Sequence, residues 1–290
     1  MRFRRGAQLD PSQVSDRRGM GPIAVGGGGI VGLIVLVISL LSGGGGGGGL
    51  DGGGGGIPTE LQFGREGTDL SSQCRTGDDA NQRQDCRIVA VINSVQAHWR
   101  TNFAGYRPAR TVFFDGGTTT GCGTASSAVG PFYCPADEQV YIDLGFYEEL
   151  RGRFGASGGP FAEAYVIAHE YGHHLENQLG VLDRARSGDT GPQSAGVRVE
   201  LMADCLAGMW ARGAVATGFV EELTETDIRD GLDAAAAVGD DRIQENIQGR
   251  VDPESWTHGS AEQRQRWFTT GYRATATAPS ACDTFKVGTV

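Results

Sequence analysis

Lysine is almost absent from this sequence of 290 residues, which has one lysine against 24 arginines. Positive charge of either kind is scarce from residue 57 onward, where 20 basic residues face 32 acidic ones. Binding to the phosphates of a nucleic acid requires a basic face. The composition therefore excludes nucleic-acid binding by residues 57–290, a stretch long enough to form the hydrophobic core of a domain.

Charged residues are missing from residues 19–50, and this gap contains a long apolar run. Residues 30–41 read IVGLIVLVISLL, and five arginines precede them. Together with its flanks the run is long enough, at the helical rise, to cross roughly 30 Å of hydrocarbon. A cleaved signal peptide is the alternative, because the run alone has that length, but no A-x-A cleavage site follows it. We expect a transmembrane helix over residues 22–42.

Glycine is concentrated around this run, with 18 of the 48 glycines between residues 20 and 57. The two glycine runs after the apolar segment predict a flexible tether. The arginines before it predict a cytoplasmic N-terminus, because positive charge is retained on that side of a membrane. We therefore predict a single-pass cell-membrane protein with a basic cytoplasmic tail (1–21), a transmembrane helix (22–42), a linker (43–56) and an extracytoplasmic domain (57–290).

The cysteines lack any C-x-x-C spacing, which weighs against a cysteine-bound zinc ion. All six follow the predicted tether, and an even number of cysteines in an oxidising compartment is typical of disulfides. The predicted pairs, the first two by nearness in sequence and the third by elimination, are Cys74–Cys86, Cys122–Cys134 and Cys205–Cys282.

Apolar residues at helical spacing predict a helix with one buried face over residues 81–100. Short β-rich runs at residues 111–114 and 139–143 predict a small sheet. A further helix should begin at Pro160 and end before Gly180. The domain is thus α+β and mainly helical, with additional helices expected over residues 197–213, 226–238 and 261–271.

The predicted helix at residue 160 contains the pattern H-E-x-x-H, formed by His169, Glu170 and His173. Residues four apart lie on one helix face, so both imidazoles can bind one ion, and the glutamate beside them can reach a water on that ion. Three of the five histidines fall within six residues here. The alternative is a chance match on an amphipathic helix. The metzincin class is excluded, because it requires glycine and histidine where this chain has Glu176 and Leu179.

Two carboxylates one helical turn apart, Glu200 and Asp204, suggest the rest of the site. Zinc in hydrolytic sites takes three protein ligands and an open position, and two histidines with a glutamate form a known set. We expect Glu200 to be the third ligand of one zinc ion per chain and Asp204 to accept a hydrogen bond from a ligand histidine. His258 is a rival third ligand or an ordinary turn residue, but we prefer a role in stabilising the oxyanion of the transition state.

Around these residues the chain resembles the bacterial putative neutral zinc metallopeptidase family, which belongs with the gluzincin-like enzymes. The resemblance covers nearly the whole chain and implies that His169 and His173 bind zinc and that Glu170 is the catalytic acid and base. The E-x-x-A-D pattern at Glu200 implies the third ligand. The matching blocks are QVSDRRG (13–19), VYIDLGFYEEL (140–150), HEYGHHLENQLG (169–180), ELMADCLAGMW (200–210) and THGSAEQRQRWFTTGY (257–272).

The sequence therefore predicts a membrane-anchored, zincin-like endopeptidase in which Glu170 activates a metal-bound water. Its partners should be a peptide or protein substrate and the membrane, and residues 140–143 should form an edge strand that pairs with the substrate. Two alternatives stay open. One is an anchored binding or assembly protein without catalysis, and the other is a zinc amidase acting on cell-wall crosslinks.

Overall fold

The computed structural model describes residues 1–19 and 69–290 of the chain. The predicted transmembrane helix (22–42) and linker (43–56) lie outside the described residues. Among the helices of the described ranges, none is both long enough and apolar enough to cross a bilayer.

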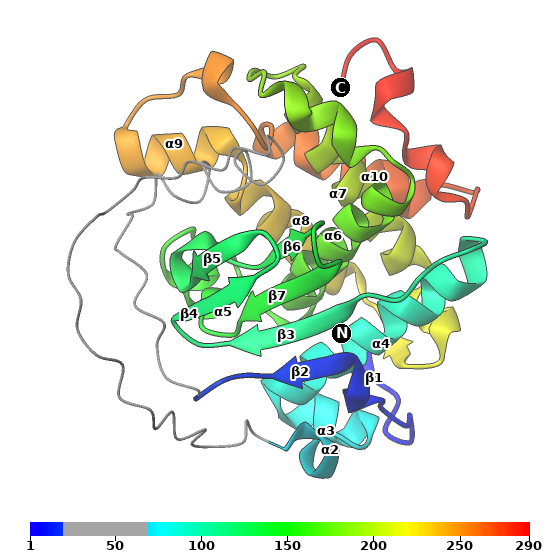
Figure 1. The fold of residues 1–290 in the computed structure, drawn as a ribbon. Helices are drawn as coiled ribbons and strands as arrows, with labels where there is room; N and C mark the ends of the chain where they lie inside the picture. The colour runs from blue at the N-terminus through cyan, green and yellow to red at the C-terminus, as the bar shows by residue number, and fades with distance from the viewer. Residues whose placement is uncertain (20–68) are drawn as a thin grey trace, which may run out of the picture.

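A four-stranded sheet with the order β2-β3-β7-β6 forms the centre of one side of the molecule (Figure 1). The expected strands are confirmed as β3 and β7, which are parallel, and β2 extends the parallel part on the far side of β3. The strand β6 runs antiparallel to β7. The bounds are β2 Val14–Asp16, β3 Arg110–Phe114, β6 Phe132–Cys134 and β7 Gln139–Asp143.

The alternation of side chains along these strands gives the sheet two buried faces. Phe113, Val140 and Ile142 belong to the main core, which the helices cover. The side chains between them, such as Phe114 and Tyr141, form a second apolar cluster on the opposite face. A hairpin of β4 (Gly117–Thr120) and β5 (Gly123–Ser126) supplies Ala125 to that second cluster.

The predicted helices are confirmed within a few residues, and the domain is mainly helical. The helix expected over residues 81–100 begins later, because Arg83 is extended and separates two helices. The longer helices are α4 Gln84–Asn102, α6 Pro160–Gln178, α7 Ala195–Gly213, α8 Glu225–Ala237 and α10 Ala261–Arg273. The remaining elements include α2 Leu70–Gln73, α3 Gly77–Gln82, α5 Phe146–Gly152, α9 Asp240–Gln248, β1 Arg2–Phe3 and β8 Val220–Glu222.

All three predicted disulfides are confirmed. They join Cys74 to Cys86, Cys122 to Cys134 and Cys205 to Cys282, so no cysteine of the described ranges is free.

Residues 1–19 do not form a separate tail, which corrects the domain boundaries expected from the sequence. The strand β1 pairs with β8, β2 pairs with β3, and Phe3 is only 1% exposed. Asn81 exchanges two hydrogen bonds with the backbone of Phe3, and Asn93 does the same with Asp10. The five arginines suggested a tail by their charge alone, whereas the apolar residues between them are what the fold buries. Residues 1–19 and 69–290 therefore share one folded unit.

This packing predicts how the two parts respond to a reagent that cannot cross membranes. Single cysteines placed at Arg5, whose side chain is 85% exposed, and at exposed Glu245 should react with an impermeant maleimide together or not at all in intact cells. Gel-shift labelling, with lysed cells as the reference for full reaction, measures both. Reaction at position 245 alone would place residue 5 on the other side of the membrane, as the predicted cytoplasmic tail requires.

Candidate metal centre and active site

The two helices that carry the predicted site residues, α6 and α7, cross in close contact. Gly172 of α6 faces Ala203 of α7, where a Cβ atom on the glycine would lie only 2.9 Å from the Ala203 Cα. A larger residue would push the helices apart. The glycine inside H-E-x-x-H therefore lets the histidine face of α6 meet the carboxylate face of α7.

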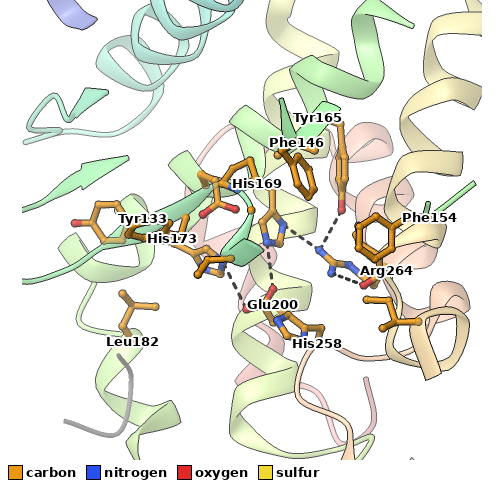
Figure 2. A pocket seen from close by; sticks show the side chains of 18 of the residues that line it. Tyr133, Phe146, Phe154, Tyr165, His169, His173, Leu182, Glu200, His258 and Arg264 are labelled. Atoms are coloured by element: carbon orange, nitrogen blue, oxygen red, sulfur yellow. Dashed lines mark hydrogen bonds and ion pairs between the residues drawn. The ribbon is translucent and has the colours of Figure 1, made fainter. Parts of the chain in front are cut away.

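This crossing brings His169, His173 and Glu200 together, as the sequence predicted (Figure 2). One ligand atom of each lies within 4.8 Å of the others. The Nε2 atom of His169 is 3.1 Å from Glu200 Oε2, and that of His173 is 3.6 Å from Oε1. Ligand atoms about 2.0–2.2 Å from a zinc ion are separated by similar distances. The three residues therefore fit a zinc ion in both chemistry and spacing.

The charges at this triad favour a cation. Burial lowers the pKa of His169, but Asp204 and Glu200 outweigh it and raise the pKa to about 9. Burial raises the pKa of Glu200, yet the neighbouring histidines lower it well below its usual range. His173 differs, because burial lowers its pKa to about 4 and Glu200 offsets only part of this. Without metal, the proton on His169 therefore balances the negative charge of the neighbouring carboxylates. A bound cation would replace that proton.

Asp204 lies where the sequence placed it, beside the second nitrogen of a histidine. It is fully buried, and its Oδ1 is 2.9 Å from His169 Nδ1. The same carboxylate accepts hydrogen bonds from Tyr165 and, at 2.9 Å, from the Arg264 Nε. With Nδ1 of His169 donating to Asp204, Nε2 is left to face the metal position.

Tyr165 and Arg264 were not predicted from the sequence. Arg264 comes from α10, which packs so closely on α7 that a Cβ on Gly271 would lie 1.8 Å from the Cys205 carbonyl oxygen. The sequence did contain a signal for Arg264, because residue 264 falls on the apolar face of α10 with Ala261 and Phe268. An arginine in such a face needs a buried partner.

Glu176 is a further residue that sequence reasoning missed, and its carboxylate contacts the other histidine of the triad. Its Oε2 is 2.7 Å from His173 Nδ1, and its Oε1 has no hydrogen-bond partner among the described residues. The side chain is 0% exposed, and burial, followed by repulsion from Glu200, raises its pKa well above the usual range. Each histidine of the triad therefore has its own carboxyl group at Nδ1. The spacing of three residues after His173 was the available signal.

Replacing Glu176 should weaken metal binding in a graded way. Glu176→Leu removes the acceptor at His173 Nδ1, and we expect zinc affinity to fall roughly 10–100-fold. Glu176→Gln keeps an acceptor oxygen and should restore most of it. Competition with a chromophoric chelator measures both, and thermal unfolding of the metal-free variants is the control for folding. Equal zinc affinities of the Leu variant and the wild type would contradict this role of Glu176.

Glu170 borders the triad and is nine-tenths buried. Burial raises its pKa to about 8, and His169 and a backbone hydrogen bond from Tyr133 oppose the rise only in part. A carboxylate with a raised pKa beside a metal position is suited to accepting and returning a proton near neutral pH.

His258 lies in the same cavity but is not one of the three clustered ligands. Its Nδ1 is 3.2 Å from Asp240 Oδ1, and Asp240 also accepts the backbone N–H groups of Thr257, His258 and Gly259. Burial lowers the pKa of His258, but Glu200 and Asp240 outweigh it and raise the pKa. Asp240 thus holds this loop and ring in place, a contact that the sequence did not indicate.

The two remaining histidines have structural surroundings. His174 is fully buried, and its ring nitrogens lie next to the Tyr133 hydroxyl and the Arg107 carbonyl. His98 packs on Trp99, far from the triad in the sequence and on another helix.

One expected contribution to the site is corrected by the topology. Residues 140–143 were expected to form an edge strand, but β7 is paired on both sides, by β3 and β6. The outermost strand on this side is β6, whose residues Phe132 and Tyr133 line the cavity. Strand order depends on pairing between distant segments, which the apolar pattern of one strand does not contain.

A helix carrying two histidines and a glutamate, met by a carboxylate from a second helix, is the side-chain arrangement of H-E-x-x-H metal sites. The comparisons with known proteins give the family. Residues 2–285 match the family described as putative neutral zinc metallopeptidase, and the chain belongs to it.

Two relatives illustrate the spread of this family. The chain is 56% identical over 226 residues to the uncharacterized protein Rv2575 of Mycobacterium tuberculosis, covering 76% of each chain. It is 38% identical over 246 residues to the uncharacterized protein YpfJ of Escherichia coli K12, covering 78% of this chain and 83% of the relative. No solved structure matches the chain.

Proposed function

We propose that this protein is a zinc-dependent endopeptidase in which His169, His173 and Glu200 hold one zinc ion. The observation that carries the proposal is the meeting of these three ligand atoms within 4.8 Å of one another, in a cavity that Glu170 also lines. Membership of a zinc metallopeptidase family agrees with it.

In this proposal one glutamate transfers protons, and two other acidic side chains orient the histidine ligands. A zinc ion bound at the triad would lower the pKa of a water toward about 7 and polarise the substrate carbonyl. Glu170 accepts the proton of the attacking water and then donates it to the leaving amine. Asp204 and Glu176 keep the two imidazoles oriented throughout.

The substrate backbone would lie along β6. This strand is the outer one of the sheet, and its Tyr133 lines the cavity and bonds through its backbone to Glu170. An extended peptide added to a free strand edge is held by main-chain hydrogen bonds. Such pairing would bring a peptide bond to the Glu170 carboxylate.

His258 should stabilise the oxyanion rather than bind the metal. We expect His258→Ala to lower kcat about 100–1,000-fold, the usual cost of losing one oxyanion donor. Bound zinc, measured by mass spectrometry of the native protein, should stay at one per chain. Zinc loss in this variant would instead make His258 a ligand.

The direct test is hydrolysis of a diverse peptide mixture by the zinc-loaded full chain, followed by mass spectrometry, with Glu170→Gln as the blank. New termini produced by the wild type alone would support an endopeptidase. Wild-type protein that holds zinc and cleaves no peptide would overturn it.

Two other functions are distinguished by the same preparation. A zinc amidase would release fragments from purified cell-wall peptidoglycan while leaving the peptide mixture intact. An anchored binding or assembly protein would do neither. The presence of Glu170 next to the ligand positions favours a hydrolase, because metal binding alone does not need it.

We also propose that the described domain lies outside the cytoplasm, because three disulfides suit an oxidising compartment. Residues 1–19 would share that compartment. Labelling of both cysteines of the topology test above, in intact cells, would support this location.

A further inference from the structure

The wall of the cavity beyond the metal triad is apolar over most of its area. Phe146 of α5 and Phe154, which follows that helix, have ring centroids 6.4 Å apart and are each 8% exposed. Val166 of α6, Val238 at the end of α8 and Ile243 of α9 complete this part of the wall. Two stretches of the chain, residues 146–166 and 238–243, thus contribute apolar side chains to one cavity.

The position of these side chains separates them from the reacting groups. Figure 2 shows Phe146 and Phe154 on the side of the triad where Arg264 lies, and Tyr133 and Leu182 on the side of His173. An extended substrate crossing the triad would therefore place a side chain next to the Phe146 and Phe154 rings.

Charge at this end of the cavity is already neutralised. Arg264 donates to both oxygens of Asp204, to the Tyr165 hydroxyl and to the Val238 carbonyl. The other charged side chains that line the cavity are the triad, Glu170 and His258. A charged substrate side chain entering beside Phe154 would thus lose its hydration without gaining a partner.

The whole cavity, including the space beside the triad and Glu170, is small enough that its apolar end has room for a single substrate side chain. Its volume is about 130 Å³. An apolar cavity of roughly 150 Å³ is large enough to take up benzene. A leucine, methionine or phenylalanine side chain is of this order, whereas alanine would leave most of the volume empty.

We propose that the apolar end of this cavity, at Phe146 and Phe154, is the specificity pocket of the enzyme and that it accepts a large apolar side chain of a residue flanking the cleaved bond. The inference rests on the proposed peptidase function and narrows its substrates to segments with leucine, methionine or phenylalanine at that position. Such residues are buried in folded proteins, so unfolded or flexible segments are the substrate class.

The first test measures binding, so that it does not depend on turnover. The amino-acid hydroxamates of leucine, phenylalanine, alanine and aspartate share one metal-binding group and differ in side chain. Calorimetric titration of the zinc-loaded full chain should give at least about tenfold tighter binding for leucine and phenylalanine than for alanine, and weaker binding still for aspartate. Equal affinities would overturn the pocket.

The second test changes the pocket. Phe154→Arg should abolish the preference for apolar hydroxamates and favour aspartate, whereas Phe154→Leu should preserve it. Ile247→Arg makes the same kind of change on α9, at a residue 45% exposed and outside the cavity, and should behave as the wild type. An unchanged order of affinities in Phe154→Arg that still unfolds cooperatively would contradict the proposal.

The experiments distinguish a wrong pocket assignment from a wrong assignment of the peptidase function. Peptide hydrolysis without any side-chain preference would overturn the pocket and leave the enzyme. Preference for apolar hydroxamates without hydrolysis of any peptide would keep the pocket and overturn the endopeptidase.

Discussion

Replacing Glu170 by glutamine should remove turnover while leaving zinc bound. The amide has the size of the carboxylate but cannot accept a proton from water or return one to the leaving amine. General acid–base catalysis contributes about 100–10,000-fold, and we expect kcat to fall by that factor. Glu170 is not one of the three clustered ligands, so the zinc content should stay at one per chain.

The matched control for this variant lies on the same helix. Glu163 is also a buried glutamate of α6, but it bonds to Gln84 and Arg87 and does not line the cavity. Glu163→Gln should therefore keep kcat within a few-fold of the wild type. Turnover of Glu170→Gln at the wild-type rate would show that another group is the base, and loss of its zinc would place Glu170 in the metal site.

The pH dependence offers a second view of the same residue. Without metal, burial keeps Glu170 protonated up to a pKa of about 8. A cation at the triad favours the ionised form, so its pKa should be lower in the zinc-loaded enzyme. Activity should fall on the acidic side as Glu170 becomes protonated and can no longer accept the proton of water.

The long helices and the metal ligands could be predicted because their signals are local. Apolar residues at helical spacing predicted α4, and a proline and a glycine marked the ends of α6. The helical period also placed the two histidines of α6 on one face. The bounds of these long helices differ from the expected ones by up to three residues. Nearness in sequence likewise sufficed for two of the disulfides.

The short strands β1 and β2 could not be predicted, because their stability comes from partners far along the chain. A strand of two residues, such as β1, has no periodicity, and its partner β8 is more than 200 residues away. The arginines around Phe3 were therefore interpreted by their charge, whereas the fold uses the apolar residues between them. Pairing of this kind appears only in three dimensions.

Some of the residues that form hydrogen bonds around the candidate site could be predicted from the sequence, and others could not. Asp204 was predicted, because it is one helical turn from Glu200 on the same helix. Arg264 and Asp240 come from other helices, and only the tertiary packing brings them to Asp204 and His258. Local spacing therefore identified the ligands, while the surrounding hydrogen bonds depended on how the helices cross.

Replacing Glu200 by alanine should remove both zinc and activity. The carboxylate is the one ligand that comes from α7, and it lies between the two imidazoles. Its loss leaves two histidines of the same helix and no negative charge among the three clustered positions. The decrease in zinc affinity should exceed the roughly 10–100-fold that follows from removing an outer hydrogen-bonding partner.

Graded variants give this prediction its controls. Asp204→Asn should weaken zinc binding by no more than about 100-fold, because only the support of His169 changes. Zinc at 100 times its dissociation constant stabilises a protein by about 2.7 kcal/mol. Added zinc should therefore raise the Tm of the wild type, raise that of Asp204→Asn less at the same concentration, and leave that of Glu200→Ala unchanged. A full zinc-dependent rise in Glu200→Ala, together with its absence in His258→Ala, would transfer the third ligand to His258.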